Sequence, residues 1–255
     1  MGTENTSWKR LAAEGTAVLF SILLAFSIDA AWQQRQERES DLIHLQGLLE
    51  ELHSHKVLLG EAITAHRRTV ERGYELLELL SPEPDAEATV RMTDAIHGLL
   101  NYYRINVPFG SLQTAISSGA IARMSDVELA SALASWPTSI EDLLEEEDNG
   151  GTVVAYDFFV HLGEKVVLAD VYERRLLMPT VRGTEEVVAE VAVRKLPDAP
   201  YATDYSVLYG DIAFANELLY FVMLAQSSHG EAIFASEKLT GLSARLDTCL
   251  LEARC

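Results

Sequence analysis

Residues 42–80, LIHLQGLLEELHSHKVLLGEAITAHRRTVERGYELLELL, decide the fold. With Leu42 as position a of a heptad, nine of the twelve a and d positions are aliphatic, and Lys56, His66 and Gly73 fill the others. This pattern, free of proline, predicts one long helix over 33–80 with a coiled-coil-like seam, ended by Ser81-Pro-Glu-Pro84. The seam consists of Leu42, Leu45, Leu49, Leu52, Leu59, Ile63, Val70, Leu77 and Leu80.

An uncharged apolar run, Gly15–Ile28, precedes this helix. As a helix it is about 21 Å long, which is short for a hydrocarbon core of about 30 Å. Glu14 and Asp29 border the run, where their carboxylates reach headgroups or water. Trp8 and Trp32 lie beyond them, about 36 Å apart along a helix, as an interfacial aromatic pair does. We therefore expect a tail over 1–10 and a transmembrane helix over 11–32.

Two other interpretations of the run compete with a membrane span. A cleaved signal peptide would use Lys9-Arg10, the apolar run and a site such as Ala25-Phe-Ser27. No proline or turn follows the run, which favours an uncleaved span. A buried helix of a soluble protein is also compatible with so short a run. Its N-terminal position and the flanking tryptophans argue against that interpretation.

The charge is strongly acidic and unevenly distributed. The chain has 255 residues, with 20 Lys and Arg against 39 Asp and Glu, for a net charge of −19. Charges balance within residues 1–38, so residues 39–255 carry the whole excess. Nucleic-acid affinity comes largely from Lys and Arg that neutralise phosphates, so we expect no nucleic-acid partner. The acidity predicts a well-solvated surface.

Segments beyond the long helix predict a helical domain over 85–255. Asn149-Gly150-Gly151 and His229-Gly230 are expected to be breaks, and Asp211 an N-cap. Residues near 179–210 are expected to be irregular, although Glu186–Lys195 alternates partly like a strand. The expected helices are Ala88–Tyr103, Ser111–Ser118, Asp126–Trp136, Thr138–Asp148, Thr152–Arg175, Ile212–Ser227 and Glu231–Glu252.

The cysteines predict neither a metal site nor a redox compartment. Cys249 and Cys255 form no C-x-x-C and have no histidines at zinc spacing. On a continuous helix they would lie about 9 Å apart along the axis, too far for a disulfide.

Two stretches resemble an uncharacterised bacterial family of single-pass membrane proteins. The first, Leu24-Ala-Phe-Ser-Ile-Asp-Ala-Ala-Trp-Gln-Gln-Arg35, matches a span that ends in Ile/Val-Asp-x-Trp before an Arg/Glu-rich helix. The second, Leu112–Trp136, matches an internal signature of leucine, Ser-Gly, an apolar pair, an acidic or amide residue and Leu-x-x-x-Leu. Ala31 and Ala130 depart from the family pattern. The resemblance covers about the first 147 residues and implies an anchored helical fold, with no established activity.

Orientation and location follow from the anchor and the resemblance. Lys9 and Arg10 on one side balance Arg35 and Arg38 on the other under the positive-inside rule. The short basic tail favours an N-terminus inside. We expect a single-pass protein of the bacterial inner membrane with its bulk domain on the periplasmic side. Its expected partners are the lipid bilayer and a second membrane or envelope protein.

Two helical motifs invite a metal-site interpretation. Glu50-Glu-Leu-His53 contains E-x-x-H, the motif of di-iron bundles, and Asp94-Ala-Ile-His97 is similar. Glu50 and His53 fall at heptad positions b and e, off the seam, so a solvated face is expected instead. His53, His55 and His66 cluster on the helix, and His66 at a d position is either a pH-sensitive interface residue or a histidine accommodated at the seam.

No Walker loop, G-x-S-x-G, G-x-G-x-x-G or kinase motif is present, and Ser117-Ser118-Gly119 is interpreted as a helix break. The sequence therefore predicts an all-α protein with an anchor, a long juxtamembrane helix and a bundle packed along it. The expected role is a non-enzymatic membrane-tethered scaffold, sensor or interaction module without a cofactor. The alternative is an enzyme or metal-binding bundle whose site is assembled from dispersed histidines and carboxylates. The soluble part is expected to be a monomer whose seam is covered by its own later helices.

Overall fold

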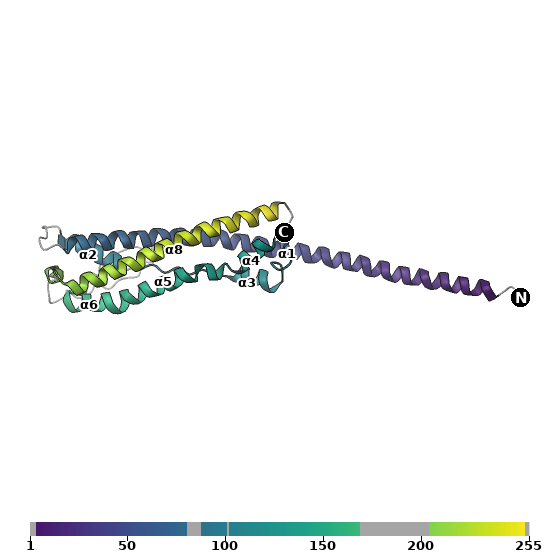
Figure 1. Cartoon of the computed structure of the whole chain (residues 1–255), viewed down its shortest axis with the longest axis horizontal. Coiled ribbons are helices and arrows are strands. Elements are labelled where there is room, and N and C mark those ends of the chain that lie inside the picture. The colour runs from purple at the N-terminus through teal and green to yellow at the C-terminus, as the bar shows by residue number, and fades with distance from the viewer. Residues whose placement is uncertain (1–3, 81–87, 101, 169–203, 253–254) are drawn as a thin grey trace, which may run out of the picture. The chain divides into compact units, whose positions relative to one another are not determined.

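The computed structural model describes residues 4–80, 88–100, 102–168, 204–252 and 255, and every regular element within them is helical (Figure 1). This confirms the all-α prediction. The α-helices are α1 (Glu4–Leu79), α2 (Ala88–Leu100), α3 (Gly110–Ser117), α4 (Val127–Ala134), α5 (Glu141–Thr152), α6 (Phe159–Lys165) and α8 (Ile212–Leu251). Short turns of other helical types are η1 (Pro137–Ile140), η2 (Val153–Phe158) and η3 (Tyr205–Leu208).

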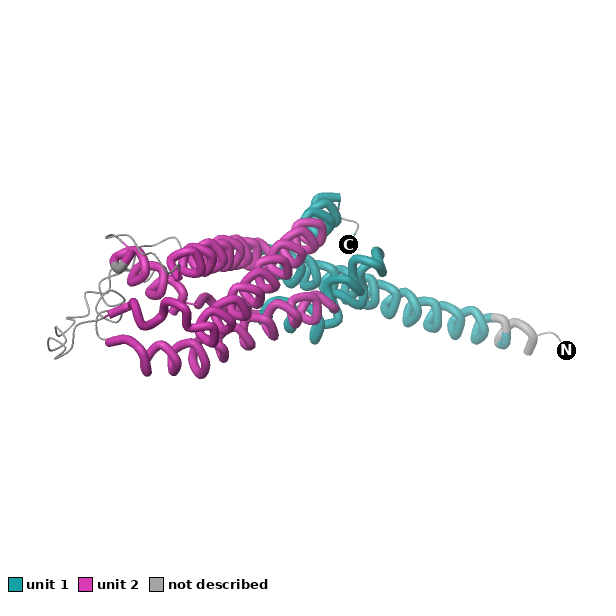
Figure 2. The backbone as a smooth tube through the Cα atoms, turned by 60° about the vertical axis from the view of Figure 1, so that its left-hand side comes forward, with its two compact units in different colours: residues 1–51, 109–134, 244–255 teal, residues 52–108, 135–243 magenta. Residues whose placement is uncertain are grey.

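The chain divides into two compact units (Figure 2). Unit 1 comprises residues 1–51, 109–134 and 244–255, and unit 2 comprises residues 52–108 and 135–243. Each unit therefore contains segments far apart in the sequence. Helices α1 and α8 contribute residues to both.

The apolar run of α1 is fully exposed along its length. The helix begins at Glu4, inside the predicted tail, and continues without interruption through Leu79. Trp8 and Trp32 are 73% and 68% exposed. This is the one helix, among the described residues, that is long and apolar enough to cross a membrane. The border residues face outward as well: Glu14 accepts from Arg10 at 3.3 Å, and Asp29 accepts from the Gln33 amide at 3.3 Å.

Unit 2 is a helical bundle that includes α1 from Leu52 to its end at Leu79. Its core combines aliphatic side chains of α1 and α2 with a stack of phenylalanines. Phe158 of η2 lies between Phe214 and Phe221 of α8, with ring centroids 5.3 and 6.3 Å away. The later helices thus cover the inward face of α1, as expected of a helix with one apolar stripe.

The buried stripe of α1 is rotated from the predicted a/d seam towards positions d and g. In unit 1 it contains Leu45 and Leu48, and in unit 2 it contains Leu52, His55, Leu59, Ala62, His66, Thr69, Gly73 and Leu76. The a residues Leu42, Leu49, Ile63, Val70 and Leu77 are only half-buried, and Lys56 is exposed. Three of the five g positions hold small or polar residues, His55, Ala62 and Thr69. A pattern based on aliphatic side chains therefore does not find this stripe.

Two buried histidines of the stripe are held by hydrogen bonds within unit 2. His66 and Glu147 are 0% and 1% exposed, and His66 Nε2 lies 2.7 Å from Glu147 Oε1. The Ile105 amide donates to the other carboxylate oxygen at 2.7 Å. His55 accepts at Nδ1 from the Trp136 indole at 3.1 Å, so its Nε2 carries the proton donated to the Pro108 carbonyl at 2.6 Å. Both histidines of the stripe are thus tied to other segments of unit 2.

The predicted turn at Asn149-Gly150-Gly151 is wrong. Helix α5 runs through these residues and continues through η2 into α6. Gly150 is needed for close packing, because a Cβ there would lie 2.5 Å from the Tyr102 ring and hydroxyl. Tyr102 is in turn held by Ser228 at 3.0 Å. The conformation at Gly150 is therefore decided by packing against Tyr102, and local sequence patterns do not show such packing.

The predicted break at His229-Gly230 is also wrong, because α8 is continuous from Ile212 to Leu251. His229 bonds the Ile63 carbonyl at 3.1 Å and so belongs to the packed face of the helix. The predicted N-cap is confirmed, since Asp211 Oδ1 accepts from the Phe214 amide at 3.1 Å. The strand-like stretch Glu186–Lys195 lies outside the described residues.

The expectation about the cysteines is wrong as well. Helix α8 ends at Leu251, between Cys249 and Cys255, so the distance along a continuous helix does not apply. The two residues form a disulfide, with their Cα atoms 5.1 Å apart.

The two adjacent glycines of α5 provide a test of helix against turn. Gly150→Ala should destabilise the protein by about 1–3 kcal/mol, because the new methyl group collides with Tyr102. Gly151→Ala should be neutral or stabilise by up to about 1 kcal/mol, because the new methyl group makes only ordinary contacts, with Arg104 at 3.6 Å and Tyr102 at 4.0 Å, and alanine favours helix. Thermal unfolding of full-length protein in detergent, followed at 222 nm, measures both. Equal losses from the two substitutions would argue for a turn.

A charged cluster joins α6 to the start of α8 within unit 2. His161 lies with Nε2 3.1 Å from Asp211 and Nδ1 3.1 Å from Glu217, while Lys165 approaches Asp211 at 3.3 Å. Both ring nitrogens face carboxylates, so the arrangement favours the doubly protonated imidazolium. Burial lowers the pKa of His161, but the hydrogen bonds to Glu217 and Asp211 outweigh it and raise the pKa overall. The pKa of Asp211 is lowered to about 2, mainly by the hydrogen bond from the Phe214 amide and next by the one from His161.

The cluster predicts a pH-dependent stability. Because the folded pKa of His161 is raised, its stabilisation is complete below pH about 6.5 and is lost as the pH rises through the folded value. The unfolding temperature should therefore fall as the pH rises from about 6.5 through the raised pKa of His161, and His161→Gln should flatten this part of the profile. His53→Gln is the control, because His53 is exposed and its substitution should leave the slope unchanged. An unaltered slope in His161→Gln would refute the assignment.

Candidate functional site

A groove of about 680 Å³ lies in unit 1 on α1, shortly after Trp32. One face of α1, the loop between α3 and α4, and the C-terminal residue form its walls. The lining residues are Gln34, Glu37, Arg38, Asp41, Leu42, Leu45, Ala120, Arg123, Ser125 and Cys255. Its volume is that of a small-molecule site, and its lining mixes apolar side chains with both signs of charge.

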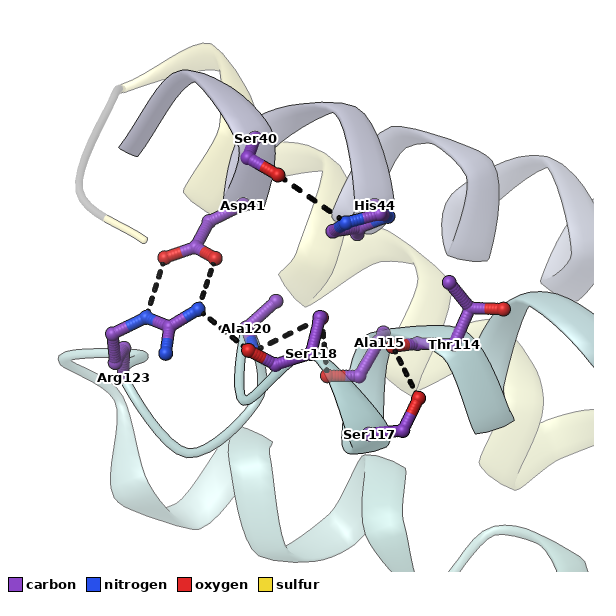
Figure 3. Close-up of polar contacts among 9 residues, drawn as sticks. All are labelled: Ser40, Asp41, His44, Thr114, Ala115, Ser117, Ser118, Ala120 and Arg123. Carbon is purple, nitrogen blue, oxygen red and sulfur yellow. Dashed lines mark hydrogen bonds and ion pairs between the residues drawn. The ribbon is translucent and has the colours of Figure 1, made fainter. Parts of the chain in front are cut away.

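An arginine–carboxylate pair fixes the loop wall of the groove to α1. Arg123 donates through two nitrogens to Asp41, at 2.8 and 2.5 Å, and also to the Ser118 carbonyl at 2.9 Å (Figure 3). Asp41 is 15% exposed and Arg123 46% exposed. The hydrogen bond from Arg123 lowers the pKa of Asp41, so the pair is charged at neutral pH. A two-pronged pair of this kind orients the loop as well as attaching it.

The Ser118-Gly119 break makes this attachment possible. Gly119 has φ of +79°, a conformation that favours glycine, and a Cβ there would lie 2.7 Å from Arg123 Nη1. The chain therefore reverses after α3 and brings Arg123 back against α1. The structure thus agrees with the interpretation of Ser117-Ser118-Gly119 as a helix break, and it gives the break a role in shaping the groove.

Carboxylates cap both short helices beside the groove. Glu51 of α1 accepts from the Ser111 and Leu112 amides at 2.6 and 3.0 Å, which satisfies the first turn of α3 from another element. Asp126 caps α4 by accepting from the Leu129 amide at 2.9 Å. Arg245 of α8 binds the same Asp126 at 2.8 Å. Three separate stretches of chain are joined in this way into one unit.

The C-terminal residue completes the groove. The disulfide holds Cys255 to the last turn of α8, and the Ser125 amide donates to the Cys255 main-chain oxygen at 2.8 Å. Both Ser125 and Cys255 line the groove. The Cys249–Cys255 disulfide therefore holds Cys255 in place in the groove lining.

Two charged residues of the groove lining have no direct hydrogen-bond or ion-pair partner among the described residues. Glu37 and Arg38 are exposed and make neither a hydrogen bond nor an ion pair within the described part of the chain, although Glu37 interacts electrostatically with Arg123. By contrast, Arg35 and Glu39, which lie on the same turns of α1 outside the groove, pair with each other at 3.2 Å. Glu37 and Arg38 are thus the groove charges available to a ligand.

The residues of the E-x-x-H motif and of the similar Asp94–His97 motif do not converge. Glu50 and His53 are exposed, Asp94 is half-buried and His97 is buried. Across the described residues, no group of three His, Cys, Asp or Glu side chains has a geometry that could hold a metal ion.

Sequence reasoning missed the residues that build the groove. Asp41, Arg123 and Glu51 contact partners 82, 82 and 60 residues away, and no local pattern signals such pairs. Asp126 carried a signal, since an acidic residue three positions before Leu129 is an N-cap pattern. The stretch quoted for the family resemblance, Leu112–Trp136, contains the loop wall and α4.

Comparison with known proteins gives no match to any protein-family model, curated protein or solved structure.

A double-mutant cycle measures the Asp41–Arg123 pair. Asp41→Asn, Arg123→Gln and the double variant should give a coupling free energy of about 1 kcal/mol, from chemical unfolding of full-length protein in detergent. The coupling should be lost as the pH falls from about 3.9 through the lowered pKa of Asp41. The exposed Arg35–Glu39 pair is the control and should give about 0.3 kcal/mol. Equal coupling in the two pairs would contradict a special role for Asp41–Arg123.

Proposed function

We propose that this chain is a membrane-tethered, non-enzymatic interaction module whose groove in unit 1 receives a ligand beside the bilayer. The observation that carries the proposal is the continuity of α1 from Glu4 to Leu79. Its apolar residues before Trp32 have no protein partner among the described residues, while the groove begins at Gln34. A ligand site so close to an unpartnered apolar helix favours a role at the membrane surface.

The disulfide supports the proposed location of the bulk domain. Disulfides persist in oxidising compartments such as the bacterial periplasm and are rare in the cytosol. The Cys249–Cys255 bond therefore favours the orientation with the N-terminus inside and the soluble part outside. The family resemblance implies an anchored helical fold, which is compatible with this orientation. Membership of that family remains part of the proposal.

The alternative, an enzyme or metal protein with a dispersed site, has less support. It requires histidines and carboxylates that converge on an accessible space. In unit 2 the buried pair His66–Glu147 lies in the core, and His161 is bonded to two carboxylates. These arrangements fit structural roles.

Cell fractionation tests the anchoring. Full-length protein should sediment with membranes and resist carbonate extraction, because the apolar face of α1 is satisfied only by lipid. A fragment that begins at Gln36 should be recovered in the soluble fraction and should be monomeric by light scattering. Carbonate-soluble full-length protein would contradict the proposal. A mature N-terminus near Ile28 would instead identify the run as a cleaved signal.

A further inference from the structure

We propose that the groove binds the phosphoethanolamine headgroup of a phospholipid, through Arg38 on the phosphate and Glu37 on the primary ammonium. This inference rests on the proposed membrane anchoring and names the ligand of that same groove.

Depth along α1 is the first argument. Gln34 and Arg38 lie about 3 and 9 Å beyond Trp32 along the helix axis. A headgroup layer extends about 5–7 Å beyond the hydrocarbon core on each side of a bilayer. With Trp32 at the edge of the hydrocarbon core, Gln34 lies within the headgroup layer, whereas Glu37 and Arg38 lie just beyond it. A long side chain such as that of Arg38 extends back towards the headgroups. This part of the groove thus borders the headgroup layer. The occupant nearest to it is therefore a lipid of the same leaflet.

Charge selects a zwitterionic headgroup. Asp41 pairs directly with Arg123, whereas Glu37 acts on Arg123 only electrostatically, without a hydrogen bond. One carboxylate and one guanidinium of the lining, Glu37 and Arg38, are therefore left without a direct partner. The charges of the four ionisable side chains of the lining sum to zero, in a chain whose net charge is −19. An anionic headgroup would meet one free cation and a repulsive domain. A headgroup with a phosphate and an ammonium complements both free charges.

The absence of aromatic rings in the groove distinguishes between two zwitterions. Recognition of a trimethylammonium group relies on aromatic faces, since that group has no N–H to donate. The groove lining contains no aromatic side chain, at least among the described residues. A primary ammonium donates hydrogen bonds to a carboxylate and to an amide oxygen, which Glu37 and Gln34 supply. The lining therefore favours phosphoethanolamine over phosphocholine.

Native mass spectrometry of full-length protein in detergent tests the site, with added phosphatidylethanolamine, phosphatidylcholine or phosphatidylglycerol of identical acyl chains. One phosphatidylethanolamine should be retained, with an affinity about tenfold above the other two lipids, since one charge-assisted hydrogen bond is worth about that factor. Glu37→Gln and Arg38→Gln should each remove this preference. Glu39→Gln and Arg35→Gln, the same changes on the same turns outside the groove, should preserve it.

Three results would overturn the headgroup site: a preference for phosphatidylglycerol, equal retention of all three lipids, or the same loss in the control variants. The measurement in detergent requires no membrane insertion, so it is independent of fractionation. A protein that sediments with membranes but shows no lipid preference contradicts the headgroup site alone. A protein that is absent from the membrane fraction contradicts the anchoring.

Discussion

The structure depends on a single property of α1: an α-helix satisfies its backbone hydrogen bonds internally, whatever surrounds it. One uninterrupted helix can therefore present apolar side chains to lipid, charged side chains to an interface and a buried stripe to a protein core. In this chain three kinds of side chain follow one another along α1: exposed apolar ones at Gly15–Ile28, polar and charged ones at Gln34–Asp41 and a buried stripe from Leu45 onward. The groove lies in the middle stretch, where side chains of both charges are available.

Polar residues in the buried stripe specify how the bundle of unit 2 packs. His66 is bonded through Nε2 to Glu147, and His55 through both ring nitrogens to Trp136 and Pro108, all from other segments of the same chain. A symmetric parallel pairing through α1 would place each histidine against its own copy, without these partners. The same residues that weaken a coiled-coil dimer thus favour intramolecular packing. Whether the soluble part is monomeric stays a prediction that light scattering decides.

Local sequence patterns predicted the elements that local physics controls. The heptads and the proline-rich stop predicted α1, which ends at Leu79, and Asp211 was recognised as an N-cap because a cap is a local hydrogen bond. The glycines at Gly150 and Gly230 were misinterpreted as breaks. At Gly150 the decisive contact is with Tyr102, 48 positions earlier in the chain. The sequence alone does not distinguish a glycine that allows close packing from a glycine that allows a turn.

The groove was less predictable than the fold, for the same reason. Its clamp joins Asp41 to Arg123, the cap of α3 comes from Glu51, and the disulfide forms only because α8 ends between its two cysteines. The E-x-x-H pattern singled out Glu50 and His53, which are exposed. The neighbouring Glu51 is the residue that caps α3. Each of these roles follows from contacts between distant segments.

Site-directed spin labelling of full-length protein in lipid bilayers tests the central claim most directly. Single labels at Leu23, Arg38 and Leu48 sample the three stretches of α1, and accessibility to oxygen and to a water-soluble nickel complex distinguishes lipid, water and protein core. We predict access to oxygen alone at Leu23, to the nickel complex at Arg38 and to neither at Leu48. A Leu23 label that is readily reached by the nickel complex, or a Leu48 label that is reached by either reagent, would contradict the account.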